Sequence, residues 1–281
     1  YTGEDTLSLH DALPIFAENS HGFRPLGFGF TNLAALFIHQ LLPYESVRAR
    51  DYAESLMCYL QGVVALTSIE LAEQKGAFQE YAKNRKSFLK VMKQHAELVA
   101  GTEKNSPLKG VSLKKIWDEV LSRGEKSGFR NSQFTAIAPT GTISLFMDCD
   151  TTGIEPDFAL VKRKTLAGGG HIILTNQSVA PALQKLGYKP SEDMVKLTPE
   201  HRSVFKTAHE ISARDHLLMV ASVQKYVSGA ISKTINLPAD AKVEDIEGLY
   251  WLGWEKGLKS LAVYRDGSKG AQPLEDCRVC G

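Results

Sequence analysis

A change of pattern at residues 133–147 constrains the fold of this chain more than any other feature. Residues 133–138 (QFTAIA) form a short apolar run typical of a strand, residues 139–142 (PTGT) interrupt it, and residues 143–147 (ISLFM) resume an apolar pattern. Proline and glycine close together mark a turn, so the segment predicts a strand, a tight turn and a helix in succession. A strand that leads directly into a helix is typical of α/β proteins.

The rest of the sequence alternates between helical and strand-like stretches in the same way. Apolar residues at helical spacing predict helices, and short apolar runs predict strands. This order indicates the α/β class with parallel strand pairing, and a glycine triplet at 168–170 marks a further break. One long helix is expected from a cap at Ser46 to Gly76. Other helices are expected at 33–42, 78–98, 113–123, 178–186, 199–226 and 243–257, and strands at 231–237 and 261–264.

Charge and cysteine content exclude several classes of protein. With 281 residues the chain is long enough for one large or two ordinary domains. Lys and Arg number 33 against 32 Asp and Glu, a net charge of +1, which provides no basic field for nucleic acid or an anionic membrane surface. The apolar runs are shorter than the 18 or so residues that a membrane-spanning helix needs. Four cysteines are too few for a disulfide scaffold, and a reducing cytoplasm is expected.

The first sixteen residues are expected to be foreign to the fold. Residues 6–15 (TLSLHDALPI) resemble the translation of a common sequencing adaptor. Segments of this kind are set aside in fold reasoning. The reading frame is therefore expected to begin inside a gene, with the native N-terminal part of the protein missing.

The turn after the first predicted strand is a candidate anion site. Backbone N–H groups at a helix start attract anions, and a glycine lets a phosphate approach the backbone. The hydroxyl of Ser144 and two threonine hydroxyls of the turn add possible hydrogen bonds. The segment lacks the lysine of a P-loop, so a merely capped helix stays open as the alternative. The predicted phosphate-binding residues are Pro139, Thr140, Gly141, Thr142 and Ile143.

The cysteines fall into two kinds. Cys277 and Cys280 form a C-x-x-C pair near the end of the chain, and its spacing suits a redox dithiol, half of a zinc site or an inert pair. Cys58, on the apolar side of a long helix, is expected to be a small core residue. Cys149 lies between Asp148 and Asp150, whose charges raise a thiol's pKa, and it is expected to be structural. The eight histidines show no metal-binding spacing, and His216 is expected to be a core residue.

Three segments together resemble the large chains of ribonucleotide reductases, in particular the adenosylcobalamin-dependent class. They are residues 138–170 (APTGTISLFMDCDTTGIEPDFALVKRKTLAGGG), 229–238 (GAISKTINLP) and 257–268 (GLKSLAVYRDGS), with weaker support from residues 27–36 and 76–81. The resemblance implies the second half of a ten-stranded α/β barrel over residues 17–270, followed by a mobile cysteine-bearing tail at 271–281. It also implies that residues 139–143 hold a substrate diphosphate through backbone amides.

The activity that the resemblance implies is the reduction of ribonucleoside di- or triphosphates to deoxyribonucleotides by thiyl-radical chemistry. Adenosylcobalamin would be the cofactor, Cys277 and Cys280 would re-reduce the active-site disulfide, and a thioredoxin- or glutaredoxin-like protein would reduce that pair in turn. The resemblance also allows a homodimeric parent protein. The loop that carries the family's radical cysteine would precede residue 24 and is absent, so the chain alone is expected to be inactive.

Other assignments stay open. Iron-dependent relatives have two adjacent tyrosines near the last barrel strand, where this chain has Val263 and Tyr264. A cobalamin generates its radical locally and needs no such relay. Residues 278–281 (RVCG) look like the start of the motif of glycyl-radical reductases, yet the body of the chain resembles the cobalamin class more closely. A non-catalytic module that binds nucleotide phosphates is the alternative from a different functional class.

Overall fold

The computed structural model describes residues 14–165, 171–189, 196–268 and 274–276, which fall into two compact units. The first unit comprises Tyr1–Phe28, Ser55–Ala136 and Tyr226–Gly229. The second comprises Gly29–Glu54, Ile137–Lys225 and Ala230–Gly281. The chain therefore passes several times between the units, and neither is a continuous stretch of sequence. The boundaries expected at residues 16 and 270 stay predictions.

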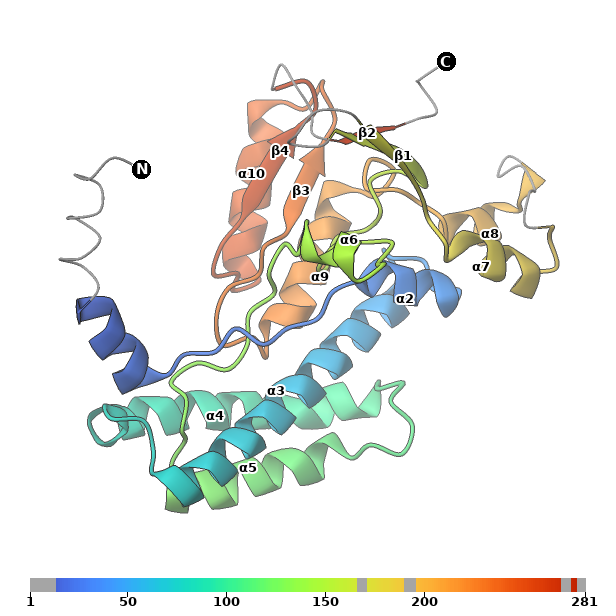
Figure 1. Ribbon diagram of the computed structural model, residues 1–281. Helices are drawn as coiled ribbons and strands as arrows, with labels where there is room; N and C mark the ends of the chain where they lie inside the picture. Colours follow the sequence, from blue (N-terminus) through green and yellow to red (C-terminus); the bar gives the residue numbers. More distant parts are fainter. Residues whose placement is uncertain (1–13, 166–170, 190–195, 269–273, 277–281) are drawn as a thin grey trace, which may run out of the picture. The chain divides into compact units, whose positions relative to one another are not determined.

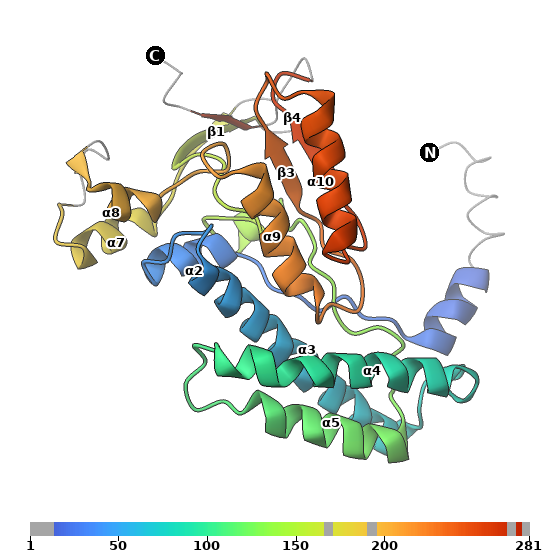
Figure 2. The same cartoon turned by 180° about the vertical axis from the view of Figure 1, so that it is seen from behind.

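Helices make up most of the first unit. Helix α3 (Val47–Lys75) begins in the second unit and continues in the first, where α4 (Tyr81–Lys104) and α5 (Leu113–Ser127) lie side by side (Figures 1 and 2). The Ser112 hydroxyl accepts from the Lys115 amide and caps α5. All three helices were predicted, and α4 extends past Gly101, which the sequence placed in a loop.

Close packing of α3 on α5 forms the centre of this unit. A Cβ atom on Gly62 would lie 2.6 Å from the Ile116 side chain, so only glycine allows this approach. The Trp117 indole is buried and donates to the Cys58 carbonyl at 3.2 Å. Cys58 is itself fully buried, which confirms it as a small core residue. The same unit contains a cluster of aromatic rings, made of Phe78, Tyr81, Phe88, Phe129 and Phe134.

Among the described residues, α3 is long and apolar enough to span a bilayer by length and composition, contrary to the expectation from its apolar runs. Half of its most apolar window is buried inside the protein. Its polar side chains are also engaged internally, because Gln61 accepts from the Thr135 hydroxyl and Ser68 donates to Asn131. These contacts are those of a helix in a protein core.

The second unit contains the parallel strands. Strand β3 (Thr234–Leu237), helix α10 (Val243–Glu255) and strand β4 (Ala262–Arg265) follow one another, and β3 pairs with β4 in parallel. This confirms the predicted α/β class and parallel pairing. One face of α10 packs on the strands in a core with Leu217 of α9 (Ala213–Gln224). That core contains Leu217, Ile235, Leu237 and Leu249.

A second core lies between short helices of the same unit. Helix α2 (Leu33–His39) contacts α7 (Val179–Lys185), and α8 (Pro199–Ser203) follows further along the chain. The predicted single helix over 199–226 is wrong, because the chain turns between α8 and α9. The Thr207 amide donates to the Glu210 carboxylate within this turn, and Ser212 then caps α9. The second core contains Ile38, Ala182, Leu183, Leu197, Val204 and Phe205.

An antiparallel sheet of β1 (Val161–Thr165), β2 (His171–Thr175) and β5 (Leu274–Asp276) was not predicted. The β1 sequence, VKRKT, lacks the apolar alternation that indicates a half-buried strand. The predicted strand at 133–138 is reduced to isolated parallel bridges, Phe28 with Thr135 in the first unit and Ile137 with Ile231 in the second. The glycine triplet at 168–170 lies outside the described residues.

Candidate functional site

The turn at residues 139–143 is open to solvent. Pro139, Gly141, Thr142 and Ile143 are exposed, and Thr140 is partly buried. In the described part of the chain, no hydrogen bond engages the backbone amides of residues 141–143. Three consecutive free N–H groups on an accessible turn are able to bind an anion, and the phosphate-binding role of residues 139–143 stays a prediction.

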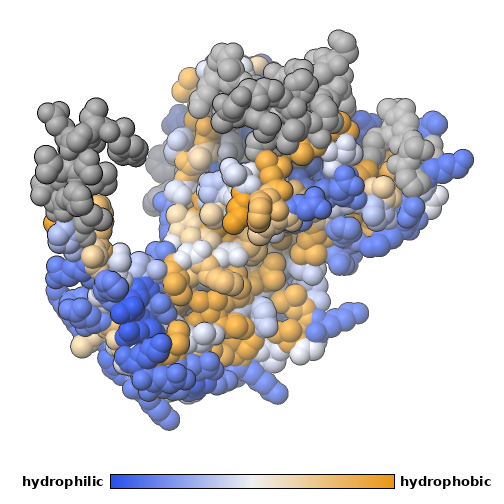
Figure 3. Space-filling model, viewed as in Figure 1, coloured by the Kyte–Doolittle hydropathy of each residue, from blue (hydrophilic) through white to orange (hydrophobic). Residues whose placement is uncertain are grey.

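The helix that follows the turn is shorter than expected. Helix α6 (Ile143–Phe146) is a single turn, and its N-cap Thr142 makes no side-chain cap hydrogen bond. A helix of four residues adds little dipole, so the free amides rather than the helix carry the attraction for an anion. Helix α6 and the residue after it carry three exposed apolar side chains, Ile143, Phe146 and Met147. Figure 3 shows apolar surface where α6 lies.

Two of the three hydroxyls predicted for the phosphate are used to hold the turn. Thr140 has a left-handed backbone (φ 54°), and its hydroxyl donates to the Pro139 carbonyl at 2.8 Å. The buried Ser144 hydroxyl donates to Thr140 Oγ1 at 2.9 Å. The Thr31 hydroxyl lies 2.8 Å from Thr140 Oγ1 and 2.7 Å from Ser144 Oγ. Only the Thr142 hydroxyl is left to face a ligand.

A second loop supports the turn from behind. The Gly153 amide donates to both Thr31 Oγ1 (2.9 Å) and Thr140 Oγ1 (2.8 Å). Gly153 has a φ of 50°, and a Cβ atom there would lie 2.6 Å from the Ala138 carbonyl oxygen. The hydroxyls of Thr31, Thr140 and Ser144, with the Gly153 amide, therefore form one hydrogen-bonded cluster that fixes the turn.

We expect Gly153→Ala to destabilise the protein by roughly 2–3 kcal/mol, because it adds left-handed strain and a clash with a backbone oxygen. Urea unfolding measures the change in the free energy of unfolding. Gly187→Ala is the matched control, since Gly187 also has a positive φ (84°) but open space around its Cβ position. Equal destabilisation by the two substitutions would contradict the close packing of Gly153 on residue 138.

Sequence reasoning missed Thr31 and Gly153. Thr31 and Asn32 directly precede α2, where Asn32 has a left-handed backbone (φ 65°) and makes no side-chain cap hydrogen bond. Its side-chain oxygen instead accepts from the Thr151 amide at 2.9 Å. A threonine before a helix carries no sequence signal for a contact more than a hundred residues away, so only the fold places it here.

The acidic residues after the turn serve structural roles. Asp150 accepts from the Ser178 amide at the start of α7 (2.9 Å), and Asp157 accepts from Asn176 (2.7 Å). Burial raises the pKa of the Cys149 thiol, with smaller contributions from Asp150 and Asp148, so this thiol is a poor nucleophile as predicted.

The described residues include no cluster of three or more His, Cys, Asp or Glu side chains that could hold a metal ion. His216 is buried, and its Nε2 lies 2.9 Å from the Ala208 carbonyl oxygen, so it is a core residue as expected. Cys277 and Cys280 lie outside the described residues, and their role stays a prediction.

Comparison with known proteins places this chain in a family. The family model described as "Ribonucleotide reductase, barrel domain" matches residues 8–264. The chain belongs to this family. Two curated relatives that are similar to this chain are vitamin B12-dependent ribonucleotide reductases. The one from Rhodopirellula baltica is 43% identical over 98% of this chain, and the one from Streptomyces coelicolor is 43% identical over 92%.

A solved structure has the same fold. The class Id ribonucleotide reductase alpha subunit of Actinobacillus ureae matches 89% of this chain and 40% of its own, with a TM-score of 0.63 and 20% identity. The barrel class predicted from the sequence is confirmed. The chain spans about 29% of the length of the two curated relatives, so it corresponds to a portion of such a protein.

Proposed function

We propose that this chain supplies the substrate-phosphate site of a ribonucleotide reductase, an oxidoreductase that replaces the ribose 2′-hydroxyl by hydrogen. The observation that carries the proposal is the exposed turn with three free amides at residues 141–143, held from behind by Thr31 and Gly153. An anion of the size of a diphosphate matches several adjacent N–H donors on one turn. The nucleotide would be a ribonucleoside diphosphate or triphosphate.

Adenosylcobalamin is the cofactor we propose, since both curated relatives are named vitamin B12-dependent. Cobalamin carries its cobalt inside a corrin ring and would supply the radical. No described residue marks where the corrin would lie, so we assign no contact and no step to it.

The remaining assignments are also proposals. Cys277 and Cys280 would re-reduce the active-site disulfide, and a thioredoxin- or glutaredoxin-like protein would reduce them in turn. We also propose that the parent enzyme works in the cytoplasm as a homodimer. We do not propose Cys58 or Cys149 as the radical cysteine, because the resemblance places that cysteine in a loop before residue 24 and both lie after it.

The test is to assay a full-length reductase that carries this chain, with ribonucleoside di- and triphosphates, a dithiol and adenosylcobalamin. We expect deoxyribonucleotide formation that stops when the cobalamin is omitted and returns when it is added back. Product formation without cobalamin would refute the proposed cofactor. Nucleotide binding without any reduction, under all these conditions, would instead favour a non-catalytic phosphate-binding module.

A further inference from the structure

An ion pair with a buried lysine is linked to the site through the loop at residues 153–155. Lys233, at the start of the parallel sheet, has a side chain that is only 1% exposed, and its Nζ contacts a carboxylate oxygen of Glu155. The other carboxylate oxygen of Glu155 accepts from the Thr234 amide at 2.7 Å. Two donors from adjacent residues therefore fix the rotation of one carboxylate against β3.

Glu155 ends a short loop, residues 153–155, in which each residue makes a hydrogen bond to another part of the unit. Gly153 donates to Thr31 and Thr140 in the hydroxyl cluster of the phosphate turn. Ile154 is fully buried, and its carbonyl accepts from the Tyr44 hydroxyl at 2.7 Å. Residues 153–155 thus connect the turn, through three successive contacts, to the edge of the sheet.

The pair is better suited to orientation than to stability. Removing two charges from water costs about as much as their attraction returns, so a buried ion pair is weak evidence for stability. Burial lowers the pKa of the Lys233 ammonium, against the opposing effect of Glu155. Burial and the Lys233 charge also lower the pKa of nearby His216 to about 3, so this imidazole adds no second positive charge at neutral pH. What the pair provides is a fixed direction for Glu155.

We propose that Glu155 and Lys233 are positioning residues for the phosphate turn, because they anchor the 153–155 loop on which the turn rests. The inference depends on the proposed function for the identity of the ligand. It adds a site component that touches neither substrate nor cofactor. When the anchor is lost, the Gly153 amide shifts and Thr140 loses the contact that fixes the free amides.

The test is steady-state kinetics of Glu155→Gln, Lys233→Met and the double variant in a full-length reductase that carries this chain. We expect the KM for the nucleotide to rise roughly tenfold, about the effect of one lost hydrogen bond to a charged group, with kcat nearly unchanged. A merely structural role would lower the amount of active enzyme, and hence apparent kcat, at constant KM. The double variant removes both charges, so its stability should recover while its KM stays high.

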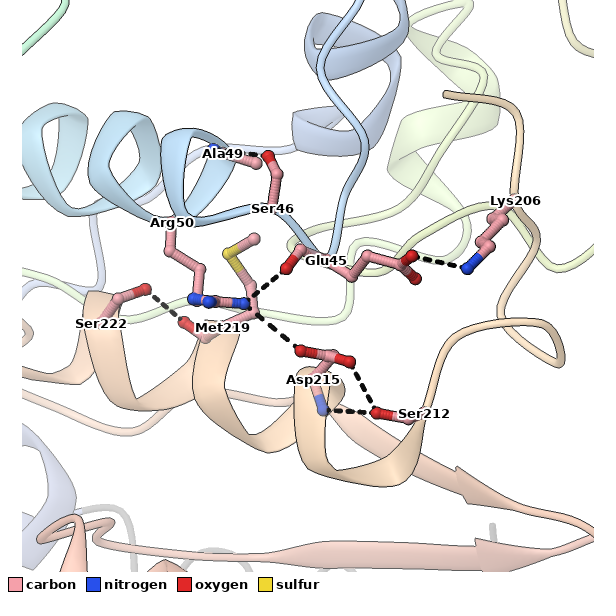
Figure 4. A network of polar contacts seen from close by, with 9 residues as sticks. All are labelled: Glu45, Ser46, Ala49, Arg50, Lys206, Ser212, Asp215, Met219 and Ser222. Atoms are coloured by element: carbon pink, nitrogen blue, oxygen red, sulfur yellow. Dashed lines mark hydrogen bonds and ion pairs between the residues drawn. The ribbon is translucent and has the colours of Figure 1, made fainter. Parts of the chain in front are cut away.

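Lys206→Met is the matched control. Lys206 pairs with Glu45 at 2.5 Å in the same unit, within the network that joins Arg50 to Asp215 (Figure 4), and neither residue contacts the turn. Its KM should equal that of the wild type. If Lys233→Met fails to fold, Glu155→Gln carries the test, because glutamine keeps the size of the side chain and an acceptor for Thr234.

The outcomes separate this inference from the proposed function. A wild-type reductase that neither binds nor reduces nucleotides would refute the proposed function. A wild-type enzyme that is active, loses affinity with Gly141→Val and keeps its KM in folded Glu155→Gln would refute only the positioning role.

Discussion

Gly141→Val in a full-length reductase that carries this chain is expected to weaken nucleotide binding roughly 100-fold, the equivalent of about one or two charge-assisted hydrogen bonds. A branched side chain at residue 141 would occupy the space that phosphate oxygens need to reach the free amides. The fold should tolerate the change, because a Cβ atom on Gly141 would meet no atom within 4 Å. Equilibrium binding of the nucleotide, together with thermal unfolding, separates the two effects.

Thr142→Ala is the comparison for this variant. It removes the one hydroxyl of the turn that the hydrogen-bonded cluster does not use, so it should cost on the order of 1 kcal/mol of binding free energy. Thr140→Ala should do more than weaken binding, since Thr140 Oγ1 accepts from Gly153 and Ser144. Negligible effects of both Gly141→Val and Thr142→Ala would count against the phosphate site.

Cys277→Ser or Cys280→Ser is expected to abolish multiple turnover with a protein reductant. Exchange between thiols and disulfides needs an accessible thiolate that meets both the oxidised site and the external reductant, and one serine removes half of the exchanging pair. A single turnover of the pre-reduced enzyme should remain nearly intact, because it precedes re-reduction. Rapid-quench measurement of deoxyribonucleotide per enzyme distinguishes one turnover from many.

A small dithiol that enters the site should restore cycling in both serine variants. Loss of bound zinc and unfolding in either variant would show instead that the pair is half of a metal site. Loss of the single turnover would place these cysteines in the chemical step itself. Either result would remove Cys277 and Cys280 from the re-reduction role.

Local patterns predicted what depends on local structure. The capped helices α3 and α5, the parallel pair β3 and β4, and the exposed turn at 139–143 all follow from residue types at short spacing. The antiparallel sheet was missed because β1 is a charged run, and its pairing with β5 joins residues more than a hundred positions apart. The prediction of a single helix over 199–226 was wrong because the helical periodicity of the sequence continues across the turn at 204–212.

The site shows the same division between local and distant contacts. The phosphate-binding role predicted for the turn stays a prediction, but two of the hydroxyls that the sequence assigned to the ligand hold the turn itself. Thr31, Gly153 and the pair of Glu155 with Lys233 act through contacts between distant segments. Those contacts depend on the tertiary fold, and no spacing in the sequence indicates them.

The three tryptophans give each unit its own optical signal. Trp117 is buried in the first unit, whereas Trp251 and Trp254 on α10 in the second unit are 60% and 74% exposed. Indole emission moves to longer wavelength in water, so the buried ring should emit at a shorter wavelength than the two exposed rings. Unfolding of the first unit would therefore move the emission to longer wavelength. A partner that covers α10 would move it to shorter wavelength.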